Sequence, residues 1–300
     1  MADDLIVNKD FENGILEWMV EPEEEDEDVE ENILDTFFLE SDADEVFPVQ
    51  TVPRKDYDRP EVKSAIANEI AKFKSFNAFK EVKDEGQKSI PTKWVVTEQP
   101  NSGKNEPYKA RMCIRGDLEK GKEAIRSDSP TASKEAIKLA LIIAANEGFK
   151  VQTGDIKSAY LQGDVLDREI YVRPPPEADA HGKLWLLLQG AYGIVDGGRL
   201  FYLKLSEKLK ALGMHRIHSD GALFTYVKKG KLHGIVTTHS DDLILAGDNI
   251  FERDITAKLK EIFKFSKFEK NNFKYCGCNV SVQKDGTIEL EQNDYIDRLE

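Results

Sequence analysis

The chain has 300 residues, of which 40% are hydrophobic, and its formal net charge is −14. Residues 1–50 hold 19 Asp and Glu against the single Lys9, so the other 250 residues hold 37 acids and 41 Lys and Arg. The acidity belongs to one end of the chain, and the remainder is mildly basic, so the overall charge does not exclude a nucleic-acid partner. Because no apolar run approaches 18 residues and no basic-then-apolar start is present, the sequence predicts neither a membrane span nor a secretory signal.

The acidic end is predicted to be a disordered linker over residues 1–55. Its densest part, residues 21–31, contains nine Asp and Glu and repels itself, so it cannot bury a core. Order is expected to begin near Arg59.

Cysteine usage indicates the compartment. Cys113, Cys276 and Cys278 are too few and too irregularly spaced for a disulfide framework or a zinc site. The sequence therefore predicts reduced thiols in the cytoplasm or the nucleus.

After residue 59, predicted helices and strands alternate irregularly. Apolar positions on one helical face predict a helix over 61–76, and Ser133 and Gly148 are a typical N-cap and stop for a helix over 134–147. The other predicted elements are strands over 79–82 and 150–155, a hairpin of 93–98 with 108–116, helices over 198–212 and 251–263, and strands over 275–283 and 287–291. This irregular order favours an α+β fold over a doubly wound parallel sheet.

Three acids occupy unusual positions. Asp241 and Asp242 interrupt the apolar run 234–247, which predicts a hairpin with both acids at its tip. Asp155 ends another predicted strand. Crowded carboxylates are costly unless a cation neutralises them, so this pattern favours a metal site.

A series of short motifs occurs in a fixed order between residues 94 and 277. It consists of Trp94-Val95-Val96, Tyr108-Lys109-Ala110-Arg111 through Arg115-Gly116, Ser129-Pro130-Thr131-Ala132, the run 155–163, Glu169-Ile170-Tyr171-Val172, Ala191-Tyr192-Gly193, Arg199, Asp241-Asp242 and Tyr275-Cys276-Gly277. The ordered set resembles the reverse transcriptase domain of copia-type LTR retrotransposons, over about residues 60–300.

The resemblance implies a right-hand polymerase with an antiparallel palm sheet backed by helices, truncated toward the thumb. The expected fingers are residues 56–131 with 163–196, the palm is 132–162 and 197–290, and residues 291–300 start the thumb or connection. The implied activity is RNA-directed DNA polymerase, with an RNA or DNA template–primer and dNTPs as partners and no membrane. In such elements integrase and RNase H belong to the same polyprotein. The resemblance also implies a location in the cytoplasm, in a virus-like particle, or in the nucleus.

The resemblance also implies the metal site. Asp155 and Asp241 are expected to bridge two Mg²⁺ ions, and Asp242 to be a ligand or an electrostatic support. Magnesium prefers carboxylate oxygens and keeps several waters, so two or three Asp suffice when the substrate supplies the rest.

Four further residues are expected to contact the nucleotide. Tyr160 is the implied steric gate that excludes a 2′-hydroxyl, although an aromatic residue there is also compatible with core packing. Lys109 and Arg111 alternate along a fingers strand and are expected to clamp the triphosphate, although charges on an exposed edge strand have the same appearance. Arg199 resembles the residue that lines the nucleotide and template side.

Two departures from the family pattern leave an alternative open. His239 stands where many members carry Tyr, and Gly197-Gly198 replaces a small-residue–Pro pair, which we expect to loosen the turn before Arg199. The alternative is a catalytically decayed or domesticated fragment that acts only as a nucleic-acid-binding or interaction protein.

Overall fold

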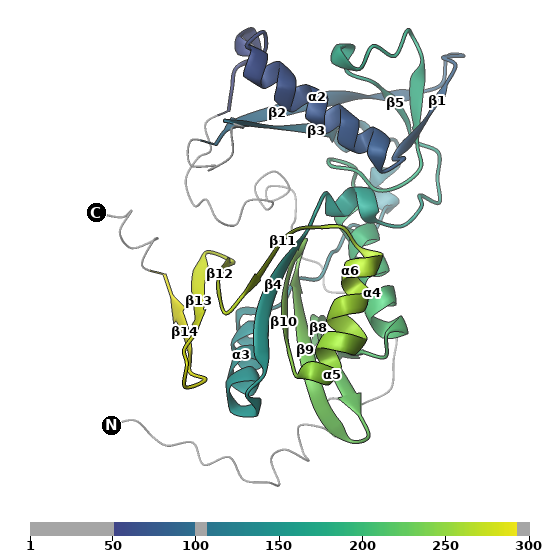
Figure 1. The fold of residues 1–300 in the computed structure, drawn as a ribbon. Coiled ribbons are helices and arrows are strands. Elements are labelled where there is room, and N and C mark those ends of the chain that lie inside the picture. The colour runs from purple at the N-terminus through teal and green to yellow at the C-terminus, as the bar shows by residue number, and fades with distance from the viewer. Residues whose placement is uncertain (1–50, 100–106, 293–300) are drawn as a thin grey trace. The chain divides into compact units, whose positions relative to one another are not determined.

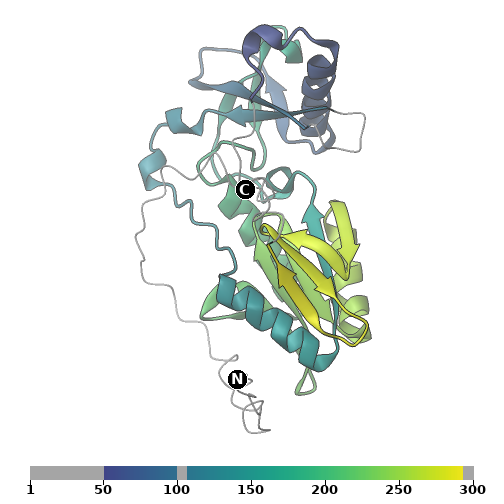
Figure 2. The ribbon, with the colours of Figure 1, turned by 90° about the vertical axis from the view of Figure 1, so that its left-hand side faces the viewer.

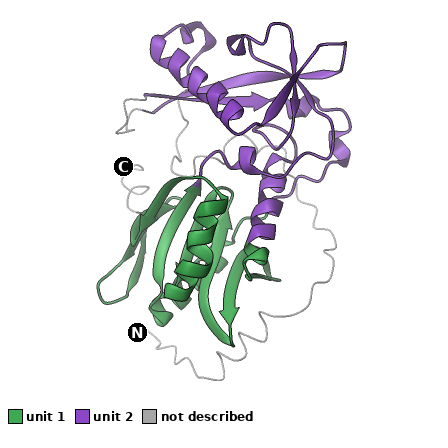
Figure 3. Ribbon diagram, turned by 45° about the vertical axis from the view of Figure 1, so that its right-hand side comes forward, with its two compact units in different colours: residues 1–44, 130–155, 209–300 green, residues 45–129, 156–208 purple. Residues whose placement is uncertain are grey.

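The computed structural model describes residues 51–99 and 107–292 (Figure 1). The chain packs as two compact units (Figure 3). Among the described residues, the first unit comprises 130–155 and 209–292, and the second comprises 51–99, 107–129 and 156–208. The fingers and palm limits given above remain a prediction, and each unit is described by itself.

The predicted acidic linker falls mostly outside the described residues. Its last five residues, 51–55, belong to the folded part: Thr51 forms a β-bridge with Thr97, and the Val52 amide donates to Val96 O at 2.8 Å. Val52 is buried against Val96 and Ala110. The folded part therefore begins before Arg59.

The second unit is built on a five-stranded sheet in the order β1-β6-β5-β2-β3. All of its pairings are antiparallel except that of β2 with β5. The strands are β1 (Phe79–Val82), β2 (Ser89–Glu98), β3 (Tyr108–Ile114), β5 (Tyr171–Arg173) and β6 (Leu184–Leu187). Helix α2 (Pro60–Ser75) comes before the sheet, and helix α4 (Gly197–Ala211) follows it. Short 3-10 turns occupy Arg54–Asp56, Gly116–Leu118, Lys122–Ala124, Ala159–Gln162 and Pro176–Ala178.

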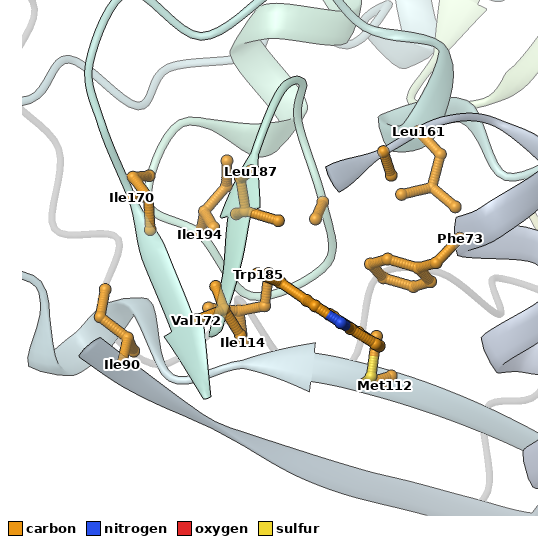
Figure 4. Close-up of a cluster of buried hydrophobic side chains, with 12 residues drawn as sticks. Phe73, Ile90, Met112, Ile114, Leu161, Ile170, Val172, Trp185, Leu187 and Ile194 are labelled. Carbon is orange, nitrogen blue, oxygen red and sulfur yellow. The ribbon is translucent and has the colours of Figure 1, made fainter. Parts of the chain in front are cut away.

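One hydrophobic cluster joins α2 to this sheet (Figure 4). Phe73 from the end of α2 is fully buried together with Met112 of β3 and Trp185 of β6. Figure 4 shows the Trp185 ring reaching toward Met112, and Phe79 stacks on Trp185 with ring centroids 3.8 Å apart. Leu161, which follows Tyr160, belongs to the same cluster. The segment that carries Tyr160 is therefore anchored in the core of the unit.

The first unit is built on a six-stranded sheet in the order β11-β4-β10-β9-β8-β7. The pairings from β4 to β7 are all antiparallel. The strands are β4 (Lys150–Ile156), β7 (His215–Ile217), β8 (Asp220–Lys228), β9 (Lys231–His239), β10 (Asp242–Gly247) and β11 (Phe265–Lys270). The predicted α+β class, with an antiparallel sheet backed by helices, is confirmed.

Helices cover both faces of this sheet (Figures 1 and 2). Helix α3 (Lys134–Glu147) starts at its predicted N-cap, where Ser133 Oγ accepts from the Ala136 amide, and it ends at Gly148 with φ of 64°. Its apolar side packs on the face that carries Ile244 and Ala246 of β10. The opposite face carries Gly247, whose missing side chain leaves room for the Phe251 ring.

The predicted helix over 251–263 is present, but it begins two residues earlier and ends one residue earlier than predicted, and it is irregular. The chain forms α5 (Asn249–Phe251), a π-helical segment Glu252–Thr256, and α6 (Ala257–Ile262). The start moves upstream because Asp248 is the N-cap, and its carboxylate accepts from the amides of Ile250 and Phe251 at 2.8 and 3.0 Å.

The predicted single strand over 275–283 is wrong. Cys276 and Gly277 have φ of 47° and 73°, which is the left-handed pair that a two-residue hairpin turn requires. The chain therefore forms β12 (Asn272–Tyr275), β13 (Cys278–Val282) and β14 (Ile288–Glu291), an antiparallel three-stranded sheet. Its residues Phe273, Tyr275 and Val280 pack on the α3 face of the larger sheet.

Within residues 51–99 and 107–292, no helix is long and apolar enough to cross a membrane.

Candidate functional site

The Asp-Asp pair lies on the β9–β10 hairpin. Ser240 and Asp241 form the turn, and Ser240 adopts a φ of 54°. Asp242 is the first residue of β10 and is paired with His239, the last residue of β9. The predicted hairpin is confirmed, with Asp241 at its tip and Asp242 at the start of the strand.

Asp155 is paired directly with Asp242. In the antiparallel pairing of β4 with β10, the Cα partner of Asp155 is Asp242, and that of Thr153 is Ile244. Residues directly opposite on neighbouring strands have Cβ atoms about 4.5–5.5 Å apart and point to the same face. The fold thus brings two of the three predicted acids together at one end of the sheet, with the third next in the chain.

The side chains of this trio do not form a closed metal cage. In the part of the chain that the structure describes, no three His, Cys, Asp or Glu side chains are gathered closely enough to enclose a metal ion by themselves, so an ion at this trio would take its other ligands from water and substrate. The donor chemistry nevertheless fits magnesium: neighbouring carboxylates supply hard oxygen ligands, and their mutual repulsion favours a cation. All three acids are half-buried, which leaves one side of each open to solvent.

Two further residues lie near these acids: Ser266, which was not predicted, and Tyr275, which belongs to the motif Tyr275-Cys276-Gly277 of the family resemblance. The hydroxyl of Ser266 on β11 donates to the carboxylate of Asp155 and lies 3.5 Å from the Asp155 carbonyl oxygen. Burial raises the pKa of the Tyr275 phenol, and the nearby Cys276 and Asp242 add to this effect. Ser266 lies 111 residues from Asp155 in the sequence, so no local pattern predicts their contact.

The predicted nucleotide-binding residues belong to the second unit. Tyr160 lies in the 3-10 turn Ala159–Gln162, with its ring centroid 5.0 Å from that of Tyr192. A Cβ added at Gly198 would lie 3.7 Å from Tyr160 Oη and 3.6 Å from Ser129 Oγ. Tyr160 thus lies against the first turn of α4, where Arg199 is located.

Arg199 has a carboxylate partner that the sequence did not indicate. Its Nη1 donates to Asp128 Oδ2 at 2.7 Å and lies 3.3 Å from the Asp128 carbonyl oxygen. Arg126 donates to the same carboxylate. Asp128 therefore shares its charge between two guanidinium groups.

Lys109 and Arg111 lie on β3 and alternate with buried residues. Ala110 and Met112 face the core, so Lys109 and Arg111 share the other face of the strand and are half-buried. The predicted alternation is confirmed, whereas their contact with a triphosphate remains a prediction.

The turn before Arg199 is tightly packed rather than loosened by its glycines. A Cβ at Gly197 would lie 2.7 Å from the Ala191 carbonyl oxygen, so only glycine fits there without a shift. Main-chain hydrogen bonds from Ile114 N to Tyr192 O at 2.8 Å and from Gly116 N to Gly193 O at 3.0 Å hold the preceding segment.

The reverse transcriptase (RNA-dependent DNA polymerase) family model matches residues 75–299. The chain is 26% identical over 165 residues to the retrovirus-related Pol polyprotein from transposon RE1 of Arabidopsis thaliana, covering 53% of this chain and 11% of the relative. It is 25% identical over 209 residues to the polyprotein from transposon TNT 1-94 of Nicotiana tabacum, covering 68% of this chain and 15% of the relative. It is 27% identical over 207 residues to the truncated transposon Ty1-A Gag-Pol polyprotein of Saccharomyces cerevisiae, covering 68% of this chain and 16% of the relative.

The chain thus spans only 11% to 16% of the length of these relatives. Among solved structures it is similar to the foamy viral protease-reverse transcriptase in complex with an RNA/DNA hybrid, at 13% identity and a TM-score of 0.49, covering 81% of this chain and 29% of that one. The family assignment rests on the sequence matches. Since the family model covers most of the described residues, the chain belongs to the reverse transcriptase (RNA-dependent DNA polymerase) family.

Proposed function

We propose that this chain is the RNA-directed DNA polymerase domain of a copia-type retrotransposon, which extends a primer 3′-hydroxyl with dNTPs on an RNA or DNA template. The observation that carries the proposal is the register of β4 with β10, which pairs Asp155 with Asp242 beside Asp241 on the hairpin turn. A lone Asp-Asp pair is common, but an acid directly opposite it on a neighbouring buried strand is not a routine feature of a sheet.

Asp155, Asp241 and Asp242 are the residues that would hold two Mg²⁺ ions. Magnesium bound there would supply positive charge for the attacking primer oxygen and for the pyrophosphate leaving group. The sheet fixes the backbone of Asp155 and Asp242, since both lie in strands with ladder partners. Ser266 restrains one carboxylate oxygen of Asp155 through its hydroxyl.

Tyr160, Arg199, Lys109 and Arg111 would bind the nucleotide. The Tyr160 ring is the proposed barrier to a 2′-hydroxyl. The three cationic side chains supply hydrogen-bond donors for phosphate oxygens, with Arg offering a paired fork and Lys a point charge.

The proposed partners are a template–primer and, in a longer polyprotein, integrase and RNase H portions. The residues after 50 carry 41 Lys and Arg against 37 acids, which suits a phosphate backbone. The proposed location is the cytoplasm, in a virus-like particle, or the nucleus. All three cysteines are free thiols, in keeping with a reducing compartment.

Primer extension tests the proposal. The purified chain is incubated with poly(rA)/oligo(dT) and dTTP, with Mg²⁺ or with EDTA. We expect processive or distributive addition of dT with Mg²⁺ and none with EDTA. A well-folded chain that binds template–primer yet adds no nucleotide at any divalent ion concentration would contradict the proposal.

A further inference from the structure

Two arginines from separate segments converge on Asp128. Arg126 Nε donates to Asp128 Oδ1 at 2.5 Å, and Arg199 Nη1 donates to Asp128 Oδ2 at 2.7 Å. The Arg199 side chain is 20% exposed and the Asp128 side chain 41% exposed, so the pair is reachable from solvent. The Asp128 carboxylate therefore accepts from N–H groups of Arg199 that another anion could also reach from solvent.

The position of this pair matters because of what surrounds it. Ser129 follows Asp128 in the chain, and its hydroxyl lies near the Gly198 position together with the Tyr160 hydroxyl. Arg199 is the next residue after Gly198, on the first turn of α4. Asp128 is thus bound to Arg199 beside the proposed gate residue.

Carboxylate and phosphate oxygens use the same guanidinium donors. Both anions accept paired N–H bonds from Arg, and a triphosphate offers more charge and more oxygens than one carboxylate. Solvent screens a partly exposed ion pair, so it contributes little to stability and a polyanion is able to displace it. Asp128 also places a negative charge where the triphosphate charge would arrive.

We propose that Asp128 is an internal competitor that occupies Arg199 in the nucleotide-free protein and must be displaced when a nucleoside triphosphate binds. This inference rests on the proposed function, because it concerns the nucleotide that Arg199 is expected to bind. In this role, Asp128 lowers the affinity of the protein for the nucleotide.

A positioning role for Asp128 predicts the opposite sign. If the carboxylate held Arg199 in its working conformation, its loss would weaken nucleotide binding. If it competes, its loss would strengthen binding. The direction of the change in KM therefore separates the two roles.

The test is Asp128→Asn, which keeps the shape and removes the charge. In primer extension with varied dTTP, we expect KM to fall about two- to fivefold, the range that corresponds to the worth of such an ion pair, with little change in kcat. In an Arg199→Gln background, the same substitution should change KM by much less, because the contested guanidinium is absent.

Asp117→Asn is the matched control. Asp117 pairs with the arginine two residues before it, as Asp128 pairs with Arg126. Arg115 Nε and Nη2 donate to its two carboxylate oxygens at 2.7 and 2.6 Å, and the Asp117 side chain is 48% exposed. Because Asp117 pairs with Arg115 whereas Arg199 pairs with Asp128, we expect the KM of Asp117→Asn for dTTP to match that of the wild type.

Failure of this inference and failure of the proposed function give different results. A wild-type chain without extension activity contradicts the proposed function, but binding of inorganic tripolyphosphate by calorimetry still tests Asp128. Tighter binding by Asp128→Asn than by the wild type and Asp117→Asn supports competition. An unchanged or raised KM, or unchanged or weaker tripolyphosphate binding, overturns it.

Discussion

Tyr160 is half-buried, and its ring centroid lies 5.0 Å from that of Tyr192 while its hydroxyl faces the Gly198 position. The neighbouring Leu161 is 1% exposed and is part of the hydrophobic cluster of the second unit. The core of this turn is therefore held by Leu161 rather than by the half-buried Tyr160 ring.

We expect Tyr160→Ala to relax sugar discrimination more than it lowers dNTP use. Removing the ring opens the space that a 2′-hydroxyl would occupy, and steric exclusion discriminates more strongly than hydrophobic affinity does. Relative rNTP incorporation should rise by roughly tenfold or more, while the loss of stability stays within about 2 kcal/mol because the side chain is only half-buried. Incorporation of rUTP and dTTP is measured alongside the melting temperature.

Tyr160→Phe is the control for this prediction. It keeps the ring and removes the hydroxyl, so discrimination should remain close to that of the wild type. A packing role for Tyr160 would appear instead as a large drop in melting temperature and a parallel loss of rNTP and dTTP incorporation by the Ala variant.

In the first unit, local sequence signals predicted where helices and strands lie better than they predicted how the strands pair. Ser133 and Gly148 bound α3 because capping depends on neighbours within three or four residues. The π-helical segment Glu252–Thr256 and the turn at Cys276-Gly277 were missed, because a continuous apolar pattern does not reveal an interruption within it. Gly277 was the available signal for the turn.

The site was predicted to the extent that the family resemblance supplied it. Residue patterns placed Asp155 at a strand end and Asp241-Asp242 on a hairpin, but strand order is not encoded locally, so their pairing came from the resemblance. The contacts of Ser266 with Asp155 and of Asp128 with Arg199 span 111 and 71 residues. Neither residue lies in a recognisable motif for its contact, so neither was predicted.

At the start of α4, the two adjacent glycines differ in what surrounds them. A Cβ at Gly197 would meet the Ala191 carbonyl oxygen at 2.7 Å, whereas a Cβ at Gly198 would meet nothing closer than 3.5 Å. A side chain at position 197 therefore requires the backbone around Ala191 or Gly197 to shift, whereas a Cβ at position 198 makes ordinary van der Waals contacts. The two positions therefore form a natural matched pair.

We expect Gly197→Ala to lower stability by about 1–3 kcal/mol, the usual cost of overpacking, and to reduce dNTP binding because Arg199 is two residues away. Gly198→Ala should be neutral or stabilise the helix by up to about 1 kcal/mol, since Gly is a poorer helix former than Ala. Urea unfolding of both variants measures the difference. Equal stability of the two variants would show that the contact with Ala191 does not constrain the turn.

For the whole molecule, charge is divided unevenly along the chain. Residues 1–50 carry a net charge of −18, and the remaining residues carry a net charge of +4. An acidic segment tethered to a basic body competes with the phosphates of a nucleic acid for the same Lys and Arg side chains.

Deletion of residues 1–50 should therefore leave template–primer binding unchanged or tighten it. The affinity of both proteins should fall as salt rises, because Lys and Arg contacts release counterions from the nucleic acid. Fluorescence anisotropy with a labelled primer at several salt concentrations measures both effects. A truncated chain that loses its melting transition or binds more weakly at every salt concentration would contradict a linker role for these residues.

Asp155 and the Asp241-Asp242 pair are proposed to form one metal-dependent centre for nucleotide addition. The most direct measurement is Mg²⁺-dependent primer extension by the wild type, Asp155→Asn, Asp241→Asn and the double variant, with Asp285→Asn as control. Asp285 is an exposed carboxylate of the β13–β14 turn that accepts from the Thr287 amide, a bond that Asn retains. Each site variant should lose extension by roughly a thousandfold or more, and the double variant should lose little more, because residues that act as a unit are not additive. Melting temperatures and the activity of Asp285→Asn should match those of the wild type. Retention of wild-type extension by either Asp155→Asn or Asp241→Asn would contradict the account.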